Sequence, residues 1–137
     1  MKISKQYLND LTYQLLGCCI NIHKELGPGL LENVYHQCLI EELKYERISY
    51  LSELEVPIKY RGKKIETKLR ADLLIEDCLV VELKSVKEIQ PIFEAQLLTY
   101  MHLLKVPKGI LVNFNCLNIF KEGQKTFVND IFRELPK

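Results

Sequence analysis

Two acidic residues and one lysine in the middle of the chain have the types and spacing of a metal site. Asp72 lies in one extended apolar run, and Glu82 and Lys84 lie in the next. Alternate residues of a strand share a face, so Glu82 and Lys84 project together. A short turn between the two runs would pair Ile75 with Leu79. Asp72 then falls opposite Glu82, with Cβ atoms about 4.5–5.5 Å apart, and both carboxylates reach one cation.

Paired carboxylates repel each other unless a cation neutralises them. Oxygen ligands with room for water and phosphate suit magnesium or manganese. So short a pattern is also compatible with two purely structural roles. One is a surface salt bridge between Lys84 and either acid, and the other is a buried ion-pair network that only stabilises the fold.

Two helical segments carry further polar residues at helical spacing. Glu32 and Tyr35 are three residues apart, and Gln96 and Tyr100 are four apart, so each pair shares a helix face. Taken alone, Glu32 is a favourable acid in the first turn of a helix. Gln96 and Tyr100 alone fit the polar flank of an amphipathic helix.

The elements around these residues follow from apolar spacing and from glycine and proline. Leucines at steps of three and four predict a helix that ends at Gly27 and Pro28. A second helix runs to about Tyr45 and forms a helical hairpin with the first. Leu31, Val34 and Cys38 are expected to face inward, with Leu39 as a further candidate. The later elements are a strand at 56–60, a turn at 61–64, strands from 65, at 69–75 and at 79–84, a helix at 91–105, a buried strand at 109–114 and a tail at 120–137 that adds an edge strand or short helix. This order predicts one α/β domain, residues 1–137, with a mixed sheet flanked by helices.

Composition favours an ordinary globular protein of the cytoplasm. The formal net charge is +1, so any attraction to a polyanion must be local. Five cysteines without a C-x-x-C pair favour core residues in a reducing compartment. No segment has the length of a signal peptide core or a membrane span. The local basic run is Lys59, Arg61, Lys63, Lys64, Lys68 and Arg70, which forms either a solvated hairpin or a contact surface for a nucleic-acid backbone.

Several short motifs in order resemble one known family. These segments are Gly29-x-x-Glu32-x-x-Tyr35, Arg70-Ala71-Asp72, Val81-Glu82-Leu83-Lys84, Gln96-Leu97-Leu98-Thr99-Tyr100 and Leu111-Val112-Asn113-Phe114. Together they are similar to the GxxExxY protein family of the PD-(D/E)XK nuclease-like superfamily, over roughly residues 17–115. Ala71 departs from the superfamily pattern, which has proline there.

The resemblance implies a restriction-endonuclease-like core and a metal-dependent nuclease acting on nucleic acid, with DNA favoured. Asp72, Glu82 and Glu32 would hold Mg²⁺ or Mn²⁺, and Lys84 would position the attacking water. Gln96, Tyr100 and Tyr35 would line the substrate cleft. Independently of the resemblance, the basic run is adjacent in sequence to the Asp72 strand, so we expect Lys63, Lys64, Lys68 and Arg70 to contact the nucleic-acid backbone. The alternative is a catalytically silent module of the same fold that binds nucleic acid or protein. Cleavage mode, sequence specificity, pathway and oligomeric state stay open.

Overall fold

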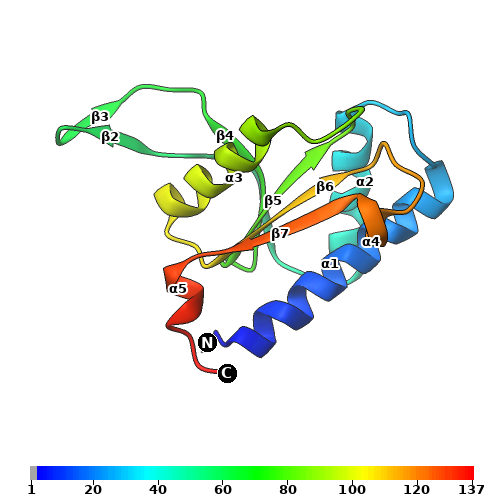
Figure 1. The fold of residues 1–137 in the computed structure, drawn as a ribbon, viewed down its shortest axis with the longest axis horizontal. Coiled ribbons are helices and arrows are strands. Elements are labelled where there is room, and N and C mark those ends of the chain that lie inside the picture. Colours follow the sequence, from blue (N-terminus) through cyan, green and yellow to red (C-terminus); the bar gives the residue numbers. More distant parts are fainter. Residues whose placement is uncertain (1–2) are drawn as a thin grey trace.

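A five-stranded mixed sheet forms the centre of the fold, and helices cover both of its faces (Figure 1). The computed structural model describes residues 3–137. In order across the sheet, the strands are β1 (Tyr50–Glu55), β4 (Arg70–Ile75), β5 (Leu79–Lys84), β6 (Lys108–Asn113) and β7 (Gln124–Val128). The β5–β6 pair is parallel and the other neighbours are antiparallel. The predicted α/β fold with a mixed, helix-flanked sheet is confirmed.

The β4–β5 hairpin has the predicted register. Ile75 pairs with Leu79, and the turn closes through a hydrogen bond from Cys78 N to Ile75 O of 3.0 Å. Glu76 and Asp77 turn the chain with left-handed φ angles of 50° and 59°. The short loop leaves no freedom to slip the register, so the positions of the acids in these strands follow from it.

Two helices, α1 (Lys5–Leu26) and α2 (Glu32–Tyr45), cover one face of the sheet. The side chain of Ser4 caps α1 by accepting a hydrogen bond from Tyr7 N. The helix ends where Gly27 has a φ of 72°, a conformation that glycine adopts without strain. The predicted helical hairpin is thus present, and its inner side chains join one hydrophobic cluster with β4, β5 and β6.

The predicted inner face of α2 is wrong for Leu31 and Val34, whereas Leu39 is buried and Cys38 packs against the core. Leu31 is 77% exposed and lies at the N-cap, outside the helix, while Val34 is 37% exposed. The buried residues are instead Tyr35, Leu39 and Leu43, spaced four apart. This row packs into the core that α1 and α2 form with the sheet.

Helix α3 (Pro91–Leu104) covers the opposite face and connects the parallel strands β5 and β6. Leu97, Tyr100 and Met101 are its buried residues. It packs closely on β6, because a Cβ at Gly109 would lie only 2.7 Å from Met101 Sδ. This close contact fixes α3 over β6, the strand next to the one that carries Glu82 and Lys84.

The predicted strand at 56–60 is broken at Val56 and Pro57, and a separate strand, β1, precedes the break. β1 is an edge strand with mostly exposed side chains, so it lacks the apolar alternation that marks a half-buried strand. Beyond the break, β2 (Ile58–Tyr60) and β3 (Lys63–Ile65) form a separate two-stranded sheet that projects from the body (Figure 1).

The tail contains both of the predicted alternatives. Its elements are α4 (Ile119–Glu122), the edge strand β7 and α5 (Asp130–Arg133). The chain then returns to its start, where the carbonyls of Pro136 and Lys137 accept hydrogen bonds from Lys5 N and Gln6 N. Within residues 3–137, no helix has the length and apolar character needed to cross a membrane.

Candidate active site

The hydrogen-bond ladder between β4 and β5 opens at the two predicted acids. Backbone pairing extends from the turn to Leu73 and Val81. Beyond this point, Glu82 Oε2 accepts a hydrogen bond of 2.7 Å from Asp72 N, and Asp72 Oδ2 accepts one of 2.8 Å from Leu83 N. At these two positions the carboxylates of Glu82 and Asp72 accept hydrogen bonds from backbone N–H groups, as backbone carbonyls do elsewhere in the sheet. Each carboxylate is held in place by the opposite strand and keeps a second oxygen for another partner.

Asp72 is also missing from the pairing of β4 with β1. The pairs on either side of it are Ser52–Leu73 and Leu54–Ala71. Glu53, which would pair with Asp72, has a left-handed φ of 52°. Such a conformation in the middle of a strand costs about 1–3 kcal/mol and is concentrated at functional sites.

Burial and mutual repulsion both act on the two acids. Glu82 is only 4% exposed. Burial, followed by repulsion from Asp72, raises the pKa of Glu82 to about 8. Burial also raises the pKa of Asp72, although the Leu83 N–H favours its charged form. The pair therefore retains a proton near neutral pH unless a cation shares the site.

Helix α2 brings a third acid and a histidine to the same opening. Burial raises the pKa of Glu32, while nearby Lys84 lowers it and Asp72 raises it. His36 lies one turn further along α2, bonds to Ser52 Oγ at 2.9 Å and lowers the pKa of Asp72. The cavity of about 220 Å³ between them is lined by Glu32, Asn33, His36, Glu53, Asp72 and Leu83. The sequence-based interpretation missed His36, although its spacing of four from Glu32 places it on the same helix face.

Lys84 faces the acids without an ion pair to either of them. Its Nζ lies 4.4 Å from the ring centroid of Phe93, which was not among the predicted site residues. Within residues 3–137, no ion pair of 4.0 Å or less involves Lys84. The surface salt bridge that the pattern also allowed is therefore not observed, and a cation–π contact holds the ammonium beside the acids.

Helix α3, on the opposite face of the sheet from α2, contributes Tyr100 near the acids. Its side chain is 4% exposed. Burial and the charges of Glu82 and Asp72 raise its pKa, which places the phenol within electrostatic reach of both acids. Gln96 lies one turn earlier on α3 and is partly buried.

Tyr35 does not lie at a cleft surface, which corrects the expectation from the sequence. It is fully buried and stacks on Phe114, with ring centroids 4.2 Å apart. Its hydroxyl donates to Gly27 O at 2.6 Å and accepts from Leu30 N at 3.1 Å. Tyr35 thus fixes the turn from which α2 starts, and so it positions Glu32 without facing the opening.

Asn113 is a further positioning residue that sequence reasoning did not assign. It pairs with Lys84 in the β5–β6 register and is 6% exposed. Its amide donates to Val86 O at 2.9 Å, and its oxygen accepts from Val86 N and Asn115 N, each at 3.1 Å. These bonds hold the chain that leaves β5 directly after Lys84.

The donor set fits a divalent cation held by few protein ligands. Asp72 and Glu82 supply two adjacent carboxylates, and Mg²⁺ commonly binds one or two carboxylates together with waters and phosphate oxygens. In the described part of the chain, no group of three Asp, Glu, His or Cys side chains is placed to hold a metal ion. Glu32 lies at the opening, and its place as a third direct ligand stays a prediction.

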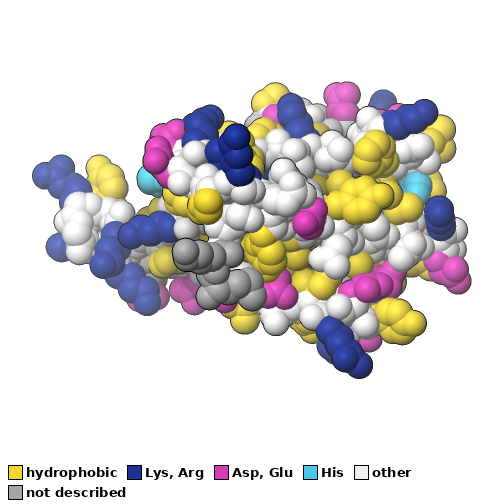
Figure 2. Space-filling model, turned by 90° about the horizontal axis from the view of Figure 1, so that it is seen from below, with side chains coloured by type: hydrophobic (Ala, Val, Ile, Leu, Met, Phe, Trp, Pro, Cys, Tyr) yellow, Lys and Arg dark blue, Asp and Glu magenta, His cyan; other side chains and the backbone are white. Residues whose placement is uncertain are grey.

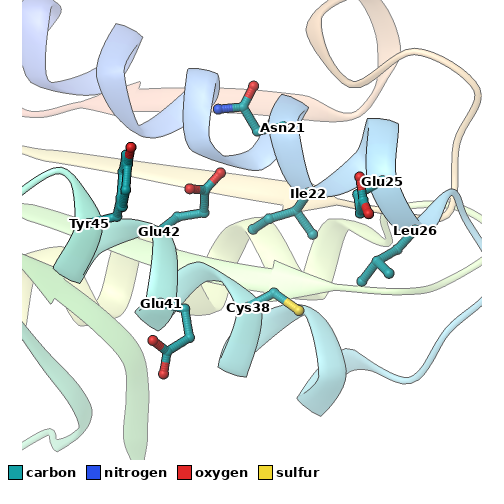
Figure 3. A pocket seen from close by; sticks show the side chains of 8 residues that line it. All are labelled: Asn21, Ile22, Glu25, Leu26, Cys38, Glu41, Glu42 and Tyr45. Atoms are coloured by element: carbon teal, nitrogen blue, oxygen red, sulfur yellow. The ribbon is translucent and has the colours of Figure 1, made fainter.

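A larger hollow lies between α1 and α2, away from these acids (Figure 3). It measures about 600 Å³, and its lining includes Glu25, Glu41 and Glu42 but no lysine or arginine. Such a lining repels phosphate groups. The smaller opening at Asp72 is therefore the better candidate for phosphate chemistry.

The predicted backbone-contacting residues lie along the chain that leads to Asp72. Arg70 is two residues before Asp72 on β4, and Lys68 lies in the segment just before β4. Lys63 and Lys64 belong to β3. All four side chains are exposed. They do not join the acid cluster itself.

A sequence model described as the PD-(D/E)XK nuclease superfamily matches residues 9–127. No match was found among curated proteins. A solved structure described as "Crystal structure of SSO0001" is 24% identical with a TM-score of 0.49, and the match covers 71% of this chain and 49% of that chain. This chain thus spans about half the length of that protein. On the match over residues 9–127, the chain belongs to the PD-(D/E)XK nuclease superfamily.

Proposed function

We propose that this chain hydrolyses phosphodiester bonds in nucleic acid, with Mg²⁺ or Mn²⁺ as cofactor and DNA as the favoured substrate. Members of the superfamily typically use divalent metals. The observation that carries the proposal is the reciprocal anchoring of Asp72 and Glu82, which aims two carboxylates at one place. The bound ion supplies Lewis-acid polarisation of the phosphate.

The remaining roles belong to side chains around the acids. Lys84, held over Phe93, stabilises negative charge that develops on the phosphate and orients the attacking water. Glu32 lines the acidic opening from α2. We assign Gln96 and Tyr100 of α3 to contacts with the substrate next to the acids. Within the superfamily we assign the chain to the GxxExxY group. The turn at Gly29, from which Glu32 and Tyr35 follow, supports this assignment.

The test is a cleavage assay with single- and double-stranded DNA and RNA, in Mg²⁺ or Mn²⁺. Lys84→Ala should lower the rate by about 10²- to 10³-fold, as expected for loss of a charge-stabilising group. Lys24→Ala, which removes an exposed lysine of α1, is the matched control and should cleave like the wild type. Equal residual activity in Asp72→Asn, Glu82→Gln and Lys84→Ala would point to a contaminating nuclease and reject the proposal.

A catalytically silent nucleic-acid-binding module is the second candidate. It is favoured by the four exposed basic residues that lie outside the acid cluster, which are Lys63, Lys64, Lys68 and Arg70. This candidate predicts salt-sensitive binding that needs no metal and no cleavage of any substrate. We place either function in the cytoplasm, because all five cysteines are free, as is usual in a reducing compartment.

A further inference from the structure

The β2–β3 hairpin, residues 58–65, forms an arm that the acid site does not use. Residues 59–66 are all exposed. Figure 2 shows the arm at the left end of the molecule, where dark blue basic side chains stand around it. At its base, Val56 is fully buried and donates a hydrogen bond of 2.9 Å to Leu69 O. The arm is therefore firmly rooted but unsupported along its length.

The charge of the molecule is concentrated on this arm and the chain that leads from it to β4. Residues 58–70 contain six lysines and arginines and one glutamate, a net charge of +5. Because the whole chain carries +1, the remainder carries −4. Within residues 3–137, none of the ion pairs of 4.0 Å or less involves a base of this segment. The positive charge is thus left for an external anion.

The two faces of the arm differ. Lys59 and Lys64 are directly opposite each other on one face. Like charges in this arrangement destabilise a hairpin, and an anionic partner would relieve the repulsion. On the other face Tyr60 is opposite Lys63. An isolated two-stranded hairpin is only marginally stable in water. A bound anionic partner would therefore stabilise this exposed, lysine-rich hairpin.

Tyr60 gives the arm an aromatic surface next to its cations. Its side chain is 66% exposed, and it directly precedes the turn at Arg61 and Gly62. Exposed aromatic rings surrounded by basic side chains bind single strands, since bases stack on the ring and phosphates meet the cations. A base inside a duplex is already stacked and paired, so it is not free for such a contact.

We propose that the β2–β3 arm binds single-stranded nucleic acid, with Tyr60 stacked on an unpaired base and Arg61 and Lys63 on the flanking phosphates. This rests on the nucleic-acid substrate proposed above and narrows it to substrates that contain an unpaired segment. Arg70 and Asp72 are two residues apart on β4, so the basic chain continues from the arm to the acid site. A single strand bound to the arm can therefore extend along this basic segment toward the acids.

The test measures binding of the full chain to a labelled 20-nucleotide single strand and to a duplex of the same length. EDTA is present, so that cleavage cannot interfere. Tyr60→Ala should weaken single-strand binding about tenfold or more and leave duplex binding within about twofold. Tyr60→Phe keeps the ring and should bind like the wild type. Tyr45→Ala, which removes a tyrosine that is 82% exposed on α2, is the control.

The outcomes separate this proposal from the proposed hydrolysis. Equal single-strand binding by wild type and Tyr60→Ala overturns the proposal that the arm binds single strands, even if the wild type cleaves nucleic acid. Single-strand binding that depends on Tyr60 supports the proposed role of the arm, even if no substrate is cleaved. A Tyr60→Ala protein with unchanged binding but altered mass in sedimentation overturns it in favour of self-association. Unchanged melting temperatures show that each variant is folded.

Discussion

Asp72 and Glu82 are held by backbone N–H groups of each other's strands, and this decides how they respond to a cation. The bonds at 2.7 and 2.8 Å fix the direction of each carboxylate before any ligand arrives. Burial makes the charged pair costly, as the raised pKa of both groups indicates. A cation that binds the folded state therefore relieves a repulsion already present in the protein.

We expect Mn²⁺ to stabilise the wild-type protein against heat. The ion binds the folded state, so a concentration about a hundredfold above its Kd contributes about 2.7 kcal/mol. Asp72→Asn should lose this stabilisation, whereas Asp77→Asn, at an exposed turn position, should keep it. Melting curves with and without Mn²⁺ measure the effect, and an equal response of both variants would contradict the site.

Without metal, the stability should fall as the pH rises from about 5 to about 8. Folding raises the pKa of Glu82 from 4.5 to about 8, so in this range the folded state binds more protons than the unfolded state. The free energy of unfolding then decreases with pH, in total by on the order of several kcal/mol. Glu82→Gln keeps an oxygen for Asp72 N but cannot titrate. Urea denaturation in EDTA should show a flatter pH dependence for this variant, and parallel curves would refute the assignment.

The junction between α1 and α2 shows how an element sets the position of a site residue. Tyr35 is buried, stacks on Phe114 and bonds to the turn at Gly27 and Leu30. This turn determines where α2 starts and hence which way Glu32 points. The motif that carries the family resemblance thus combines one residue at the site with others that shape the turn.

Tyr35→Phe should lower the free energy of unfolding by about 1–3 kcal/mol, because Gly27 O and Leu30 N lose a buried partner while the ring stacking remains. Tyr45→Phe removes a hydroxyl from a side chain that is 82% exposed, and should change stability by less than about 0.5 kcal/mol. Urea denaturation measures the free energy of unfolding of both variants, and the dependence of that free energy on urea concentration should be the same in each. A loss of similar size in both variants would contradict the role of the buried hydroxyl.

The whole molecule separates charge more strongly than its net value of +1 suggests. The acidic hollow lies between α1 and α2 (Figure 3). The basic arm precedes β4 in the chain and projects from the body of the molecule (Figure 1). Such a distribution orients a polyanion toward the arm and away from the hollow.

Nucleic-acid binding should therefore depend on where a lysine lies and not only on the net charge. In the double variant Lys63→Gln, Lys64→Gln, the slope of log K against log salt should become shallower by about 1.4 for a single strand. The double variant Lys24→Gln, Lys121→Gln has the same net charge but loses exposed lysines elsewhere, and its slope should match the wild type. Equal slopes for both variants would show that binding follows net charge alone.

The sequence alone was sufficient for the fold class, the β4–β5 register and the convergence of Asp72 with Glu82. These depend on local rules, since a short turn sets the register and strand periodicity sets the faces. It was insufficient for the break at Val56 and Pro57 and for the full inner face of α2. The apolar spacing of α2 allowed more than one inner row, and packing against the sheet selected the row of Tyr35, Leu39 and Leu43.

Only the tertiary structure decided what surrounds the acids. The ladder openings at Asp72, the left-handed Glu53 and the contact of Lys84 with Phe93 arise between segments far apart in the chain. Burial, which raises the pKa values of both acids, likewise depends on helices packed over the sheet. The residue types that could bind a metal are written in the sequence, but the distances and the exclusion of water that give them chemistry come from packing.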